Sequence, residues 1–342
     1  MKLLQARTRG LHPVIQSRWF ELSGKLNLFY FTDPAEGVRF FQALQTLNPP
    51  YCCDTVRPFA DLAATTSWRG HKRKVVPAKR TVAIGIFDGG PGLARELGAI
   101  SPPLYEIDRI EVGRRVDCSR WLNFVELASS VRWSSMAEEV QKLIEEIGPA
   151  APETGATLHA LTRNLRPGDR IKNQLADSLT ALLTGLKNNC AENFSVDITA
   201  LQESAMRHGH FQRAREIVYR RLPLLVYIDD SCLSARSGPP FLPRSDNDWC
   251  TLPGGHKASP IDRIKKMIDM GVRTSQRQNG GEPIFLLAPL DNSPDLLAPD
   301  ELLDLIRTTA EKYQVLCLCS DQQFLEDIVA EKKYRDHQLM AS

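Results

Sequence analysis

Four acidic residues of this chain have a type and spacing that could support metal chemistry. Asp229 and Asp230 directly follow the apolar run 224–228, and Asp246 and Asp248 lie a short distance further on. Carboxylates grouped in this way can bind Mg²⁺, and a bound Mg²⁺ can activate water for a nuclease or phosphohydrolase reaction. The commoner use of acids at the exit of a strand is to cap a turn or the following helix. Both interpretations stay open at this point.

A basic run is the second group with chemical potential. It lies beside Trp68, within residues 69–80, and consists of Arg69, Lys72, Arg73, Lys74, Lys79 and Arg80. Such a run can neutralise the phosphates of a nucleic-acid backbone, and it is also typical of a solvated loop. A nucleic-acid-binding module is therefore one alternative function.

Other suggestive spacings favour structural roles. The pair His208 and His210 is too short for a metal site without further ligands and indicates a break in a helix near Gly209. The segment 89–92 matches no phosphate-loop pattern and predicts a tight turn. The eight cysteines form no C-x-x-C pair, so neither a zinc site nor a disulfide framework is indicated.

The segment 26–44 has the outline of a phosphate-binding loop, with an apolar strand, a turn and an amphipathic helix. A working loop reads G-x-x-x-x-G-K-S/T. Aligned without gaps, this chain has Phe31 and Glu36 at the glycines, Gly37 at the lysine and Val38 at the hydroxyl. Glu36 would also repel a phosphate, by about 4 kcal/mol at roughly 4 Å and an effective dielectric constant near 20.

Length and composition are those of a globular protein with one sizeable α/β domain and a smaller inserted region. The chain has 342 residues, 42% of them hydrophobic and 25% charged, and a net charge of +2. No run approaches the roughly 18 apolar residues that a membrane-spanning helix needs. We therefore expect a cytoplasmic protein that has no membrane partner.

Hydrophobic periodicity predicts the elements that must position these residues. Strands are expected at 19–22, 26–31, 81–87, 104–116, 224–228, 283–288 and 315–319, and helices at 38–47, 93–100, 133–147, 169–190, 196–221, 261–272 and 300–313. The segment 148–155 is rich in Pro, Gly and Ala and is interpreted as a linker. The strand–helix–strand order at the end of the chain predicts a parallel pair with a right-handed crossover.

The order of several segments along the chain resembles that of the ABC-type ATPase heads of the SMC, RecF and OLD class of P-loop NTPases. In this class an inserted helical arm or lid splits the nucleotide-binding domain. The similar segments are 1–4, 19–28, the loop-like 26–44, the signature-like 252–256, the acidic-strand-like 283–291 and the switch-like 315–321. The resemblance implies a split α/β head, with its N-terminal half at 1–133, a helical insert at 134–222 and its C-terminal half at 223–342.

Each of these motifs departs from the family pattern. Ala288 and Pro289 stand where the family has a metal-binding Asp and a catalytic Glu, and Ser320 stands at the switch histidine. The signature-like segment keeps Leu252, Gly254 and Gly255 but has Pro253 for the usual Ser. Apolar strands followed by helices are common in α/β folds, so the order of the motifs carries the resemblance.

The resemblance therefore implies a catalytically inactive head that acts as a structural or regulatory subunit in a DNA-associated assembly, such as repair or defence. It implies pairing with a second copy or with a companion active ATPase, and contact with DNA. No cofactor is expected, and ATP with magnesium would bind only if the degenerate site still holds it. The metal-dependent enzyme and the nucleic-acid-binding module remain the alternatives.

Overall fold

The computed structural model of the protein describes residues 1–9, 17–50, 78–100, 109–125, 127–149, 151–190, 194–229, 259–290, 298–321 and 339–341. Contacts within the chain divide it into two units. The first comprises Met1–Leu93, Ile107–Val125 and Arg220–Ser342, and the second comprises Ala94–Glu106 and Glu126–Tyr219. The helical insert predicted at 134–222 overlaps most of the second unit.

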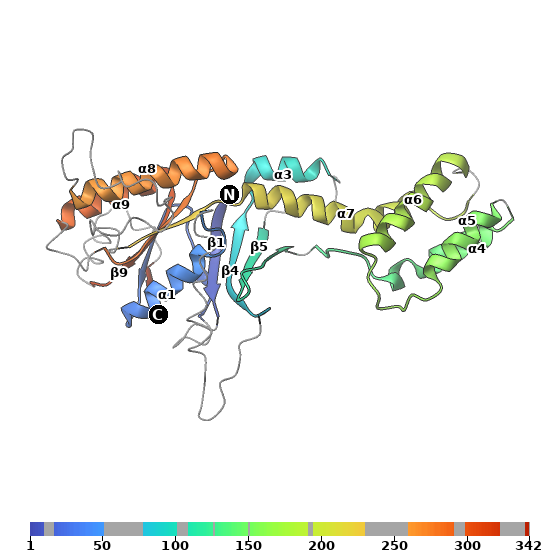
Figure 1. Cartoon of the computed structure of the whole chain (residues 1–342), viewed down its shortest axis with the longest axis horizontal. Helices are drawn as coiled ribbons and strands as arrows, with labels where there is room; N and C mark the ends of the chain where they lie inside the picture. Colours follow the sequence, from blue (N-terminus) through green and yellow to red (C-terminus); the bar gives the residue numbers. More distant parts are fainter. Residues whose placement is uncertain are drawn as a thin grey trace, which may run out of the picture. The chain divides into compact units, whose positions relative to one another are not determined.

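An antiparallel sheet forms one part of the first unit (Figure 1). Its strand order is β2-β1-β4-β5-β6, with β1 at Lys2–Thr8, β2 at Phe20–Glu21, β4 at Thr81–Asp88, β5 at Arg109–Arg115 and β6 at Arg120–Phe124. Apolar side chains alternate along the strands, so that the cross-strand pairs Ile110–Phe124 and Val112–Leu122 are buried on one face. After β4 the chain enters helix α3 (Gly90–Gly98), so the predicted tight turn at 89–92 is in part the first turn of a helix.

A parallel sheet forms the other part of the first unit. Its order is β10-β3-β9-β8-β7, with β3 at Leu26–Tyr30, β7 at Leu225–Ile228, β8 at Ile284–Leu287, β9 at Gln314–Cys319 and β10 at Leu339–Ala341. Strands β7, β8 and β9 are buried along their whole length, as expected for parallel strands covered on both faces. One strand from the start of the chain thus pairs with strands from its end. This confirms the predicted α/β class and the split of the sheet between two distant segments.

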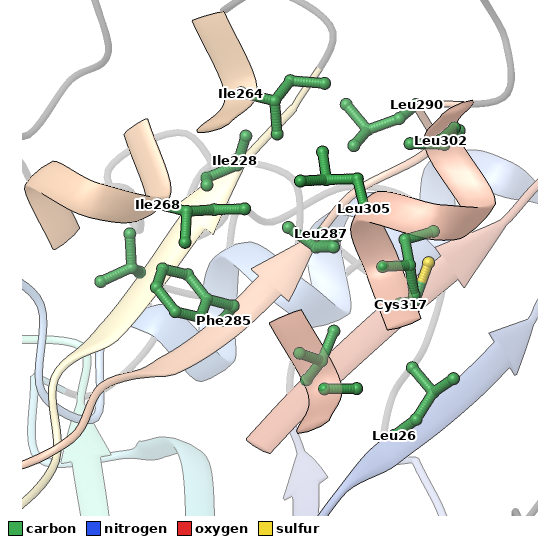
Figure 2. Close-up of a cluster of buried hydrophobic side chains, with 14 of the residues drawn as sticks. Leu26, Ile228, Ile264, Ile268, Phe285, Leu287, Leu290, Leu302, Leu305 and Cys317 are labelled. Atoms are coloured by element: carbon green, nitrogen blue, oxygen red, sulfur yellow. The ribbon is translucent and has the colours of Figure 1, made fainter. Parts of the chain in front are cut away.

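Helices α8 (Pro260–Asn279) and α9 (Pro299–Lys312) pack on one face of the parallel sheet. Figure 2 shows Ile264 and Ile268 of α8 and Leu305 of α9 around Phe285 and Leu287 of β8. The local sequence explains where α8 begins and ends. Ser259 caps its first turn, a proline follows, and Gly280 ends it with a φ of 65°. Helix α1 (Pro34–Gln45) contacts strands of both sheets.

In its described residues, the second unit contains the last part of α3, a short 3-10 turn and four further helices, and it has a core of its own. The turn and the four helices are η3 at Trp133–Ser135, α4 at Ala137–Ile147, α5 at Pro152–Thr162, α6 at Asn173–Cys190 and α7 at Ile198–Arg221, whose last residues belong to the first unit. The side chains of Leu143, Leu158 and Leu179 are fully buried. In the described part of the chain, no helix is long and apolar enough to cross a membrane.

Two predictions for this unit were wrong. Helix α5 begins at Pro152, inside the segment interpreted as a linker, because proline suits the first position of a helix. Helix α7 continues through Gly209 without a break. His210 is buried on this helix, and its burial, together with the charge of Arg213, lowers the pKa of the imidazole.

Candidate functional site

The candidate site lies at the carboxyl ends of the parallel strands, where α/β sheets bind ligands. The register pairs Tyr30 with Cys319, Cys317 with Leu287, and Leu287 with Ile228. The segments that follow β3, β9, β8 and β7 therefore all leave the sheet at the same end, the carboxyl ends of the strands. The loop-like and acidic-strand-like segments lie in one sheet, as the resemblance requires, but they are not on neighbouring strands, because β9 lies between them.

The connection from β3 to α1 is too short to wrap a phosphate. Only residues 31–33 separate the strand from the helix, so Glu36, Gly37 and Val38 lie in the first turns of α1. The reason is a strong helix start in the sequence. Asp33 is the N-cap and its Oδ1 accepts a hydrogen bond of 2.9 Å from the Ala35 N–H, while Pro34 follows at the first helical position.

The N–H groups that would bind phosphate are absent or already engaged. Pro34 has no N–H, and the N–H of Ala35 donates to the Asp33 carboxylate. The N–H groups of Glu36 and Gly37 donate to the Asp33 carbonyl, at 3.0 and 3.5 Å. Helix N-termini bind anions through free N–H groups and the helix dipole. Here an anion of the chain itself already occupies that position.

Packing also fills the space that the first glycine of a phosphate loop would leave open. The ring of Phe31 is buried and lies 6.4 Å from Phe29 and 5.7 Å from Phe40, measured between ring centroids. A Cβ atom on Gly37 would lie only 2.6 Å from Leu318 Cδ1 and 2.9 Å from Phe31 Cδ2. Gly37 therefore serves the contact between α1 and β9.

The end of the acidic-strand-like segment is apolar. Ala288 is fully buried, and its N–H donates to the carbonyl of Ile228 at 2.8 Å. Leu290 joins the core beside Leu302 (Figure 2). Pro289, which lies between Ala288 and Leu290 in the sequence, is also buried. No carboxylate follows β8 at the positions where the resemblance places the metal ligand and the catalytic base.

Sequence reasoning identified the missing groups but not the role of Asp33, which caps the helix. A gapless alignment with a phosphate loop treats residue 33 as a variable loop position. An acidic residue before a proline at the start of an amphipathic helix is, however, an N-cap signal. That signal could have located the helix start and shown that no loop remains.

The metal alternative is only partly covered by the described residues. Asp229 follows β7, is half-buried and lies at the carboxyl end of the parallel sheet. Asp230, Asp246 and Asp248 lie outside the described residues. Among the residues that the structure describes, no group of three or more His, Cys, Asp and Glu side chains could hold a metal ion.

The two predicted basic and glycine-rich segments fall largely outside the described residues. This applies to Arg69, Lys72, Arg73 and Lys74 of the basic run and to Leu252, Gly254 and Gly255 of the signature-like segment. Lys79 is described, and its Nζ lies 2.8 Å from Asp117 Oδ2. Hydrogen bonds from Lys79 and Ser119 hold the pKa of the Asp117 carboxyl well below its usual range. The carbonyl of Arg80 accepts a hydrogen bond from the N–H of Val116 at 3.0 Å.

No protein-family model and no curated protein matches this sequence. Among solved structures, the chain is similar to the Smc head domain of Pyrococcus furiosus bound to the C-terminal domain of ScpA, with 10% identity, a TM-score of 0.36 and coverage of 95% of this chain and 91% of that one. It is also similar to the SMC head domain of Thermotoga maritima, with 8% identity, a TM-score of 0.33 and coverage of 96% and 92%. The recombination mediator protein RecF in its ATPrS complex gives 9% identity, a TM-score of 0.33 and coverage of 94% and 93%.

Proposed function

We propose that this chain is a catalytically inactive ABC-type head that acts as a structural or regulatory subunit of a DNA-associated assembly, such as one for repair or defence. The observation that carries the proposal is the closed start of α1. There the Asp33 carboxylate caps the helix and the Phe31 ring fills the position of the first loop glycine.

Electrostatics argue against binding of a triphosphate at this position. Two unit charges of the same sign repel each other by about 4 kcal/mol at 4 Å and an effective dielectric constant near 20. Asp33 and Glu36 both place a carboxylate at the start of α1, and the position of the phosphate-binding lysine is Gly37. Gly37 supplies no ammonium group that would offset the repulsion, so the bound state is unfavourable for a nucleotide.

The scaffold around the closed site supports a role in assembly. The resemblance seen in the motif order implies that heads of this class pair face to face, and a degenerate head can still pair with a second copy or with a companion active ATPase. Nucleotide binding and hydrolysis then belong to the partner. In this proposal the chain contributes a stable surface to the assembly and binds DNA without a nucleotide cycle of its own.

Nucleotide binding to the purified full chain tests the proposal. Isothermal titration calorimetry with ATP and Mg²⁺ is expected to show no saturable binding, and a phosphate-release assay no hydrolysis above that of buffer. An intact ATPase measured in parallel shows that both assays work. Saturable micromolar binding, with hydrolysis that a chelator abolishes, would contradict the proposal.

The Asp33→Asn variant separates the two causes of closure. Asparagine is also a good N-cap, so the helix start is kept while the negative charge is removed. We expect no gain of ATP binding, because Phe31 still fills the site and no lysine follows. Micromolar ATP binding by this variant would show that the connection retains a phosphate-binding geometry, and the closed-site argument would be wrong.

A further inference from the structure

The second unit presents a group of exposed cations on the connection between α5 and α6. Segment 163–172 contains four cationic residues and a single acid, Asp169, and a fifth cation stands opposite it before η3. We call this group the loop cluster, and its members are Arg132, Arg163, Arg166, Arg170 and Lys172. All five side chains are exposed.

The backbone that carries the loop cluster is well ordered by hydrogen bonds. The N–H groups of Trp133 and Ser134 donate to the carbonyls of Asp169 and Pro167, at 2.7 and 3.0 Å, and the N–H of Ile171 donates to the carbonyl of Val131 at 2.9 Å. The buried side chains of Trp133 and Ile171 anchor both segments in the core of the unit. The cations are thus presented on a preorganised scaffold, which reduces the entropy lost on binding.

The positive charge of the loop cluster is not compensated within the described part of the chain. Arg132 and Arg170 are direct partners in an antiparallel bridge, and like charges at such positions destabilise the pairing. The Arg170 guanidinium donates to the Ser130 hydroxyl at 3.4 Å, which brings no negative charge. The one acid of segment 163–172, Asp169, accepts the N–H of Arg166 at 2.8 Å within the turn.

Four acids of the same unit lie together on another helix. Glu138, Glu139, Glu145 and Glu146 all lie on α4. The segment after the loop cluster is the N-terminus of α6, an 18-residue helix whose dipole adds positive potential at its first turn. An external anion at the loop cluster would therefore relieve the repulsion between Arg132 and Arg170 and interact favourably with the helix dipole.

The chemistry of the surroundings favours nucleic-acid phosphates over an acidic peptide. Guanidinium groups bind phosphate oxygens through two parallel hydrogen bonds, and serine hydroxyls such as that of Ser134 are common phosphate donors. The apolar side chains nearby, Trp133, Leu165 and Ile171, pack toward the core. Trp133 is the one aromatic residue in segments 130–135 and 163–172, and its ring is buried, so these two segments offer no ring to stack on bases.

We propose that the loop cluster binds the phosphate backbone of nucleic acid without sequence preference. This inference deepens the proposed function, since it names the surface through which the chain contacts DNA, and it rests on that proposal for its biological setting. It is independent of the basic run at 69–80, which belongs to the other unit.

Fluorescence anisotropy of the full chain with short labelled DNA duplexes of two unrelated sequences tests the inference. We expect equal affinity for both sequences and a steep loss of affinity between about 50 and 200 mM salt. The double variant Arg166→Gln/Lys172→Gln is expected to bind about tenfold more weakly at the lower salt concentration. The slope of log K against log salt should fall by about 2, because two phosphate contacts are lost.

The double variant Lys142→Gln/Lys187→Gln is the matched control. It removes the same charge from exposed positions on α4 and α6 of the same unit. Its affinity should stay within about twofold of the unmodified chain, as expected when no phosphate contact is removed. Circular-dichroism melting curves establish that both double variants are folded.

Three results would overturn the inference. These are unchanged binding by Arg166→Gln/Lys172→Gln, an equal loss in the control variant, or tighter binding of polyglutamate than of DNA. ATP titration separates this test from that of the proposed function. Saturable ATP binding would contradict the inactive head while leaving the DNA contact intact, and loss of DNA binding at the loop cluster would leave the closed nucleotide site intact.

Discussion

At the residue scale, Gly37 has one meaning in the motif alignment and another in the structure. In the motif alignment it marks a lost lysine, whereas in the structure its missing side chain allows α1 to approach β9. Within the gapless alignment, residues 31–38 could be identified from the sequence as lacking every phosphate-binding group. The positions of these residues in the fold could not be predicted from the alignment, because it assumed a loop where Asp33 and Pro34 start a helix.

We predict that Gly37→Ala lowers the free energy of unfolding by about 1–3 kcal/mol, because the added methyl group must displace Leu318 and Phe31 in a packed core. Urea unfolding followed by circular dichroism measures the change. Gly92→Ala is the control, since a Cβ there meets no atom within 4 Å. It is expected to stabilise α3, by up to about 1 kcal/mol. Equal stability of Gly37→Ala and the unmodified chain would show that the contact is loose.

At the scale of elements, Gln314 joins the two sheets of the first unit. This buried residue opens β9, and its Oε1 accepts the N–H of Leu3 in β1 at 2.8 Å. Its Nε2 donates to the carbonyls of Leu3 and Ser23, each at 2.7 Å. One side chain thus satisfies three backbone groups of the N-terminal segment.

Gln314→Leu should therefore cost about 2–4 kcal/mol of unfolding free energy, because buried backbone groups lose their partners. Gln5→Leu is the matched control on β1, where the amide makes one exposed hydrogen bond of 2.7 Å to Glu21. That change should stay within about 0.5 kcal/mol, as is usual at exposed positions. Chemical denaturation of both variants measures the difference, and similar losses would show that Gln314 does not hold the sheets together.

The elements differ in how well the sequence predicted them, for physical reasons. Amphipathic helices such as α9 and buried strands such as β8 were predicted correctly because their hydrophobic pattern is strong, whereas α8 continues seven residues beyond its predicted end. Strand β6 was missed although Asp117 and Ser119 are turn residues, because the left-handed position between them is held by Cys118, at a φ of 62°, and not by Gly or Asn. Helix α5 was missed because Pro152 was taken as part of a linker.

At the scale of the whole molecule, the two units have separate cores and should respond separately to damage. Leu179 is fully buried in the second unit, and Leu286 is fully buried in the parallel sheet of the first. We predict that Leu179→Ala lowers the stability of the second unit by about 2–5 kcal/mol, as cavity formation in a core does.

Hydrogen exchange read by mass spectrometry locates the effect. In Leu179→Ala, amides of α4, α5 and α6 should exchange faster, while those of β3, β8 and β9 stay protected. Leu286→Ala should give the reverse pattern. Uniformly faster exchange in both variants would show that the two units unfold as one.

The pairing of β3 with β9 also dictates the order in which the protein can fold. The amide of Asn27 in β3 reaches the carbonyl of Val315 in β9 across 288 residues of sequence, at 3.4 Å. Contacts of such separation form slowly, since a long chain must first close on itself. During synthesis on the ribosome, β3 must therefore wait, with its edges unpaired, until the last strands emerge. The helices at 133–190 can associate long before, because their contacts are local. This delay makes the nascent N-terminal segment a natural client for chaperones.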